Sequence, residues 1–243
     1  MSDNNAQPDV KIAGDGTVAA GTYGVVRIAG NGTLTGDVTC TELLIAGAGT
    51  CQGALVVDTL TVNGSGTFRR SVRAGAMAVN GDASIAEGLG VTTLKVRGRT
   101  SIGAGLAARD VDIRGEIAVG GDFDAERFAG EGMFKVAGLL NAGTIDFRIG
   151  AQCNAREIGG ESIVIAQSRQ VLDFWSLFGD KRLTVDEVEG DSVSLEFTTA
   201  KVVRGANVRI GEGCRIDLVE YTGELTQDPG AVVTAANKVA QVG

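Results

Sequence analysis

The sequence contains no histidine among its 243 residues. Histidine is the commonest general base and a frequent ligand of zinc and iron, so its absence argues against most acid–base enzymes and metalloenzymes. The sequence also lacks a phosphate-binding Gly-x-x-x-x-Gly-Lys-Ser/Thr loop, and its Gly-x-Gly pairs lack the third glycine of a dinucleotide-binding loop. We therefore expect a protein that is not an enzyme, with no cofactor, no metal and no nucleotide.

Proline, aromatic residues and long apolar runs are also scarce. The chain has 2 prolines, 5% aromatic residues and a net charge of −8, and no basic run suited to nucleic acid. No stretch approaches the 18 apolar residues of a membrane span, and the polar start Met-Ser-Asp has no signal segment. We expect a cytoplasmic protein, with peripheral attachment to the inner face of the cell membrane left open. Four scattered cysteines form no CxxC pair, which predicts reduced core residues.

What the sequence has in abundance is glycine, and the glycines follow a 17-residue period. Internal repeats of this kind are typical of solenoid proteins. A residue that tolerates a positive φ suits a tight corner, so we expect this column to mark a corner of each coil. Seven consecutive positions of the period are glycine: Gly30, Gly47, Gly64, Gly81, Gly98, Gly115 and Gly132.

Apolar residues follow the same period at three places in each repeat. Residues two apart lie on one face of a strand, so pairs such as Val26 with Ile28 and Val38 with Cys40 are expected to point inward. Leu34 begins a third apolar column six residues after Ile28. The pattern predicts an all-β, single-stranded β-helix, or β-solenoid, with a triangular 17-residue coil. One coil cannot bury its own apolar face, so stability depends on stacking.

The repeat is interrupted at residues 166–182. This segment contains the single tryptophan and could form an amphipathic turn for a membrane surface or a partner protein; the alternative is a lid over the barrel. After it, we expect the 17-residue spacing to resume at Val185, Val202 and Val219. The predicted organisation is a flexible tail at 1–9, coils at 10–165, the insertion, coils at 183–233 and a tail at 234–243. Candidate membrane or partner contacts are Leu172, Phe174, Trp175, Leu177 and Phe178.

The two end coils are the other distinctive places in a uniform stack. Their backbone groups lack a neighbouring strand, which invites continuation of the stack by another copy. The predicted polymerisation interface consists of Val10, Ile12 and Val18 at one end and Val219, Tyr221, Leu225 and Val232 at the other.

Coils of the form [Val/Ile]-x-Gly-x-Gly, as in Val26 to Gly32, together with the run from Ala200 to Tyr221, resemble the bactofilins, bacterial polymer-forming cytoskeletal proteins, and in particular their Firmicute-type members. The resemblance covers about residues 10–233. It implies a right-handed β-helix that assembles end to end into nonpolar, nucleotide-independent filaments, often at the membrane. Such filaments are scaffolds for cell-wall, morphology or motility machinery.

Two other functions remain open at this stage. The first is a non-polymerising β-helical adaptor that binds a membrane surface, or a membrane, cell-wall or flagellar protein, through the 166–182 insertion. The second is a carboxylate-based glycoside hydrolase or lyase, which would need a concave groove lined by carboxylates. The acidic groups Asp122/Asp124/Glu126 and Asp186/Glu187/Glu189 are interpreted instead as solvated faces.

Overall fold

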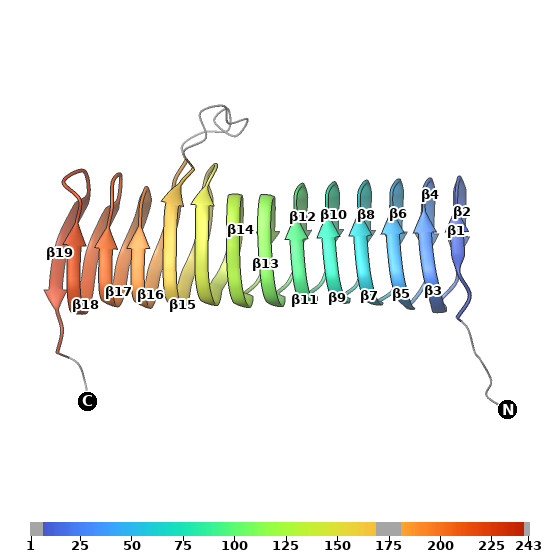
Figure 1. The fold of residues 1–243 in the computed structure, drawn as a ribbon, viewed down its shortest axis with the longest axis horizontal. Coiled ribbons are helices and arrows are strands. Elements are labelled where there is room, and N and C mark those ends of the chain that lie inside the picture. Colours follow the sequence, from blue (N-terminus) through green and yellow to red (C-terminus); the bar gives the residue numbers. More distant parts are fainter. Residues whose placement is uncertain (1–6, 169–180, 241–243) are drawn as a thin grey trace. The chain divides into compact units, whose positions relative to one another are not determined.

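The computed structural model describes residues 7–168 and 181–240, and none of these residues is helical. Neighbouring strands are parallel and belong to successive coils, as Figure 1 shows for both halves of the chain. The predicted all-β solenoid is therefore confirmed. The chain forms two compact units, Met1–Arg109 and Asp110–Gly243.

In unit 1, after the three-residue strand β1, strands of four residues alternate with strands of eight. The strands are β1 (Val10–Ile12), β2 (Asp15–Val18), β3 (Gly21–Ile28), β4 (Asn31–Leu34), β5 (Val38–Ile45), β6 (Ala48–Cys51), β7 (Leu55–Val62), β8 (Ser65–Phe68), β9 (Val72–Val79), β10 (Asp82–Ile85), β11 (Leu89–Val96) and β12 (Arg99–Ile102). The next strand, β13 (Leu106–Val119), contains the residues at which the chain passes from one unit to the other.

Each coil has three faces although it has only two strands, because the eight-residue strand bends. In β5, Val38 and Cys40 are buried, and the next buried residues are Leu43 and Ile45. Thr41, at the bend, is skipped in the pairing with β7. In chain order we call the half with Leu43 and Ile45 the first face, the four-residue strand the second face, and the half with Val38 and Cys40 the third face.

The strand register of unit 1 explains the glycine column, and the predicted need for a positive φ does not. Strands β5 and β7 pair at the 17-residue offset of the repeat, for example Leu43 with Leu60, so like residues stack. The column glycines from Gly30 to Gly98 do not have a positive φ. A Cβ atom on Gly64 would lie 2.1 Å from the carbonyl oxygen of Gly47, closer than real Cβ atoms come to any neighbour. Close backbone stacking, rather than φ, therefore requires glycine at this corner in unit 1, whereas Gly132, the last glycine of the column, does have a positive φ of 138°.

In unit 2 the strands are longer and run around the corners without a break. They are β14 (Phe123–Ile149), β15 (Cys153–Gln167), β16 (Leu183–Leu195), β17 (Thr198–Ile210), β18 (Arg215–Gln227) and β19 (Val232–Lys238). Ile163 pairs with Val193 across the insertion, and Val193 then pairs with Val208 at a shorter, 15-residue offset. The predicted 17-residue spacing of Val185, Val202 and Val219 is therefore wrong: Val185 pairs with Ala200, and Val219 pairs with Val203.

The core of unit 2 contains a cluster of four phenylalanines. Phe128 lies 5.0 Å from Phe123, 5.8 Å from Phe134 and 5.1 Å from Phe147, measured between ring centroids. Such ring pairs add specific packing energy to the burial of apolar area. All four rings are fully buried, so part of the chain's small aromatic content is packed into this one segment of the core.

Both predicted tails are shorter than expected. Pro8 accepts a hydrogen bond from the amide of Gly24 at 3.1 Å, and the Asp9 carboxylate accepts one from the amide of Val25 at 2.8 Å. At the other end, β19 includes residues 234–238 of the predicted C-terminal tail and pairs with β18 through Lys238. These residues are held by the same ladder as the rest of the solenoid.

Candidate functional site

The N-terminal edge of unit 1 is formed by β1 and β2. Val10 pairs with Val26 and Val18 pairs with Leu34, and no described strand lies on the opposite side of either. Ile12 and Val18 are buried and Val10 is half-buried. The predicted interface residues at this end therefore belong to a coil whose outer backbone edge has no strand partner among the described residues.

The C-terminal edge of unit 2 is formed by β19 and the second half of β18. Leu225 pairs with Val208 on one side, and no described strand covers its other side. Val232, on β19, is 59% exposed. Val219 lies one coil further in, because it pairs with Ala236 of β19 and is completely buried. Tyr221 is half-buried, and the Lys238 ammonium lies 5.8 Å from the centre of its ring.

Two exposed large apolar side chains lie at this edge. Among the described residues, four valines are the large apolar side chains with substantial exposure: Val56, Val164, Val232 and Val239. Val232 begins β19 and Val239 follows its last residue, so two of the four flank the terminal strand. Apolar exposure beside an open strand edge is typical of a surface that pairs with another chain.

The candidate contacts in the insertion, Leu172, Phe174, Trp175, Leu177 and Phe178, lie outside the described residues. On its C-terminal side, the described part of the insertion is held by Arg182. The guanidinium of Arg182 donates to the carbonyl of Gly213 at 2.8 Å and to the Thr199 hydroxyl at 3.3 Å. The membrane or partner contact through this segment stays a prediction.

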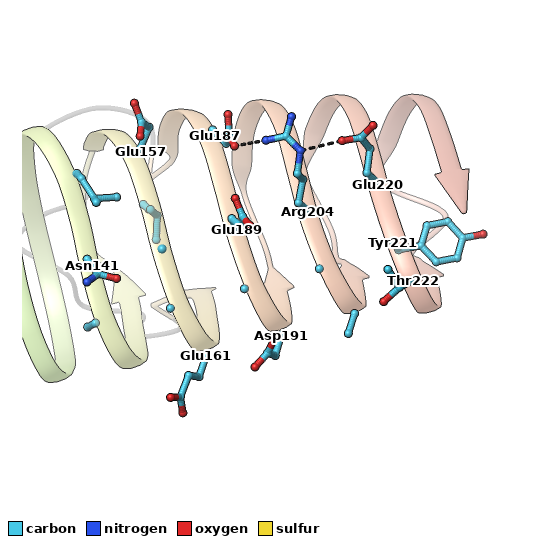
Figure 2. Close-up of a pocket in the computed structure, with 18 of the residues that line it drawn as sticks. Asn141, Glu157, Glu161, Glu187, Glu189, Asp191, Arg204, Glu220, Tyr221 and Thr222 are labelled. Atoms are coloured by element: carbon cyan, nitrogen blue, oxygen red, sulfur yellow. Dashed lines mark hydrogen bonds and ion pairs between the residues drawn. The ribbon is translucent and has the colours of Figure 1, made fainter. Parts of the chain in front are cut away.

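Sequence reasoning missed a groove on the third face of unit 2, shown in Figure 2. The groove encloses about 1060 Å³ and has a glycine floor. Gly160, Gly190 and Gly205 stack where unit 1 has Cys40 and Val57, and a Cβ atom on Gly190 would lie 2.5 Å from the carbonyl oxygen of Gly160. The third face is hollow here because glycine has no side chain to fill the inward position. The sequence did not reveal this row of glycines, because Gly190 and Gly205 pair at an offset of 15 residues rather than 17.

The walls of the groove are acidic. Its carboxylates are Glu157, Glu161, Glu187, Glu189, Asp191 and Glu220. Arg204 lies between two of them: its guanidinium forms an ion pair with Glu187 on the preceding coil and another, at 2.7 Å, with Glu220 on the following coil (Figure 2). The hydrogen bond to Glu220 is the main cause that raises the pKa of Arg204 above its ordinary value. Tyr221, Thr222 and Val239 line the groove beside β19.

A second ion pair joins strands β16 and β17 close to Arg204. Lys201 forms an ion pair with Asp186 at 2.7 Å, and the hydrogen bond to Asp186 raises the pKa of the lysine. Strand β17 therefore places Lys201 and Arg204 against acidic side chains of β16, and Arg204 also reaches β18. Two members of the acidic group Asp186/Glu187/Glu189, namely Asp186 and Glu187, therefore form ion pairs with side chains of β17.

The groove satisfies only part of what a carbohydrate-cleaving site needs. It is concave and lined by carboxylates, but a general acid is a carboxyl group kept protonated by an apolar surrounding. None of the six groove carboxylates is buried, and Glu187 and Glu220 share one arginine.

Within residues 7–168 and 181–240, no group of three His, Cys, Asp or Glu side chains is arranged to hold a metal ion. The same residues include no helix that is long and apolar enough to cross a membrane.

Comparison with known proteins gives two curated relatives, both uncharacterized. The chain is 39% identical over 106 residues to the uncharacterized protein YhbE of Bacillus subtilis (strain 168), covering 43% of this chain and 45% of the relative. It is 37% identical over 105 residues to the uncharacterized protein YhbF of the same organism, covering 42% of each chain. The chain thus spans less than half the length of the relatives it matches. No family model and no solved structure matches.

Proposed function

We propose that this protein is a scaffold that assembles end to end into filaments without nucleotide, as its resemblance to the bactofilins implies. The observation that carries the proposal is the open ladder at β1 and β2 and at β18 and β19. Unpaired amide and carbonyl groups along a strand edge are a template for another strand. Pairing them with a second copy would extend the parallel ladder that holds each unit together.

The composition of the terminal strand supports the same proposal. Soluble proteins protect sheet edges with charges, prolines or bulges. Strand β19 reads Val-Val-Thr-Ala-Ala-Asn-Lys, with one charge at its end and no proline. Among the described residues, this edge therefore has little of that protection. We infer that the surrounding coils act as a rigid spacer and that partners in cell-wall or motility machinery, if bound, use the outer faces.

Electron microscopy of the purified full chain without nucleotide tests this function. We expect filaments whose length grows with protein concentration. Val232→Asp places a charge on the open edge and is expected to abolish them. Val56→Asp is the matched control, because Val56 is 46% exposed on β7, an inner strand with partners on both sides. Monodisperse monomers at all concentrations and salt levels, or equal loss of filaments in both variants, would contradict the proposal.

A further inference from the structure

The groove in unit 2 crosses the coils rather than following one of them. Its lining comes from five successive strands, β14 to β18, and from residues 239–240 beside β19. Neighbouring coils lie about 4.8 Å apart, so these strands extend over about 19 Å. The floor is the paired row of Gly160, Gly190 and Gly205, which contributes no side chains. The groove is therefore long enough for an extended, linear molecule.

One half of the groove, over β15 and β16, gathers carboxylates on both sides of this floor. Glu157 pairs with Glu187 on one side, and Glu161 and Asp191 lie on the other side (Figure 2). Glu189 lies between the two rows. Two neighbouring coils thus bring five acidic side chains to one stretch of the groove.

The other half of the groove, from β17 onward, contains cations that the chain itself supplies. The guanidinium of Arg204 lies between the carboxylates of Glu187 and Glu220. At the end of the groove, the Lys238 ammonium lies 5.8 Å from the centre of the Tyr221 ring. Carboxylate pairs and aromatic ring faces both attract cations. In this half, the cation-binding groups of the groove are therefore already occupied.

The half over β15 and β16 has the same kind of acidic groups without such a cation. Arg204 is the one basic residue in the described lining of the groove. Within residues 7–168 and 181–240, Glu161, Glu189 and Asp191 form no ion pair. Glu189 pairs with Arg204 of β17 on one side and with Gly159 of β15 on the other. Gly159 therefore lies at the place where a second cation would match Arg204.

We propose that this half of the groove binds a linear aliphatic polyamine, with one ammonium group above Gly159 and the next beside Glu161 and Asp191. In an extended aminopropyl group, single-bond lengths place the two nitrogens about 5 Å apart. This distance is close to the coil separation of about 4.8 Å, so successive ammonium groups can face carboxylates of successive coils. A compact metal ion suits the site less, because its carboxylates form no metal-binding group among the described residues.

The floor of the groove favours a polyamine over a basic peptide. Gly190 pairs with Gly160 on one coil and with Gly205 on the next, so the backbone groups of the floor are used by the ladder. The backbone amides and carbonyls of a peptide would find no partners there. A methylene chain needs none, and its ammonium groups need only acceptors, which the carboxylates provide. Strands β15 and β16 have partners on both sides, so the site does not depend on end-to-end assembly.

Equilibrium dialysis of the full chain against labelled spermidine, at about 0.15 M salt, tests the site. We expect saturable binding to a single class of sites. The double variant Glu189→Gln, Asp191→Asn should weaken this binding by about tenfold, because it removes charge-assisted hydrogen bonds. The matched control is Asp146→Asn, Asp217→Asn, which removes the same charge from exposed residues of unit 2 outside the groove. Screening by salt should limit its effect to about twofold.

Gly159→Lys tests the position of the bound ammonium group. A Cβ atom on Gly159 would lie 3.4 Å from the Asn141 side-chain oxygen, an ordinary contact, so the fold should accept the new side chain. Its ammonium group would lie beside Glu189 and should abolish spermidine binding. Gly90→Lys adds the same charge on β11 of unit 1, where the Cβ atom would meet only Arg73 at 3.9 Å. This control should bind spermidine as the wild type does, and thermal unfolding shows that both variants are folded.

Three results would overturn the polyamine site. The first is an absence of saturable binding by the wild type. The second is an equal effect of the groove and control variants, which would show an adventitious cation held by net charge only. The third is displacement of spermidine by Mg²⁺ at equal ionic strength, or binding of a lysine-rich peptide where spermidine does not bind. Filament formation is observed separately by electron microscopy, so it can stand or fail independently of spermidine binding.

Discussion

At the residue scale, one inward position of the second face becomes larger along the chain. In unit 1 it is occupied by Gly16, Gly32, Gly49, Gly66, Ala83 and Thr100, and in unit 2 by Ile117 and Phe134. A Cβ atom would lie 2.8 Å from the side chain of Ile28 on Gly32, and 2.8 Å from the side chain of Ile45 on Gly49, so these coils have little room for a larger residue at this position. Thr100 stands out because its hydroxyl is completely buried and has no hydrogen-bond partner in the structure.

Thr100→Val should therefore stabilise unit 1. The substitution keeps the shape and removes a buried hydroxyl that makes no hydrogen bond, so we expect the free energy of unfolding to rise by about 1 kcal/mol. Thr198→Val is the matched control, because Thr198 is equally buried but its hydroxyl donates to the carbonyl of Glu196 at 3.0 Å. Chemical denaturation of both variants measures the difference. A destabilised Thr100→Val protein would show that the hydroxyl has a partner.

At the element scale, strand stacking sets which glycines are needed. Gly64→Ala should destabilise the protein by about 2 kcal/mol, because the new Cβ would lie 2.1 Å from the carbonyl oxygen of Gly47. Gly90→Ala, on β11, is the control: its Cβ would meet only the Arg73 side chain at 3.9 Å. We expect no loss of stability there, since alanine also restricts the unfolded chain. Thermal unfolding followed by circular dichroism compares the two, and equal losses would contradict the stacking explanation.

A second prediction at this scale concerns the charges that join three strands. Arg204→Met leaves Glu187 and Glu220 without their shared cation, so we expect a loss of about 1 kcal/mol at low salt. This figure is modest because the Arg204 side chain is 39% exposed and solvent screens the pairs. High salt should reduce the loss. Arg27→Met removes a single pair, with Glu42 at 3.4 Å, and should cost less. The unfolding midpoints at two salt concentrations test both statements, and a salt-independent loss would refute the electrostatic cause.

At the scale of the whole molecule, the charge is divided unequally between the units. Residues 1–109 contain 9 basic and 8 acidic residues, whereas residues 110–243 contain 13 and 22. Self-repulsion destabilises a compact unit of high net charge, and salt screens it. Added salt should therefore stabilise unit 2 more than unit 1.

The buried cysteines report on the two units separately, since Cys40 and Cys51 lie in unit 1 and Cys153 and Cys214 in unit 2. In moderate denaturant, raising the salt concentration should slow the thiol labelling of Cys153 and Cys214 several-fold more than that of Cys40 and Cys51, as measured by mass spectrometry of labelled peptides. Equal slowing of all four thiols would contradict a difference in charge repulsion between the units.

The amino-acid sequence by itself determined the coil, its three apolar faces and the position of its first edge. This was possible because stacking in register places like residues above one another. Paired residues such as Val26 and Leu43 therefore lie 17 positions apart in the sequence. Only the tertiary structure decided the rest. The 15-residue offset between β16 and β17, the Gly160–Gly190–Gly205 floor and the ion pairs of Arg204 follow from corner lengths that change within unit 2, where β14 and β15 already pair at offsets of 18 and 19 residues. Once the period changes, spacing no longer identifies spatial neighbours, and only the hydrogen-bonded register does.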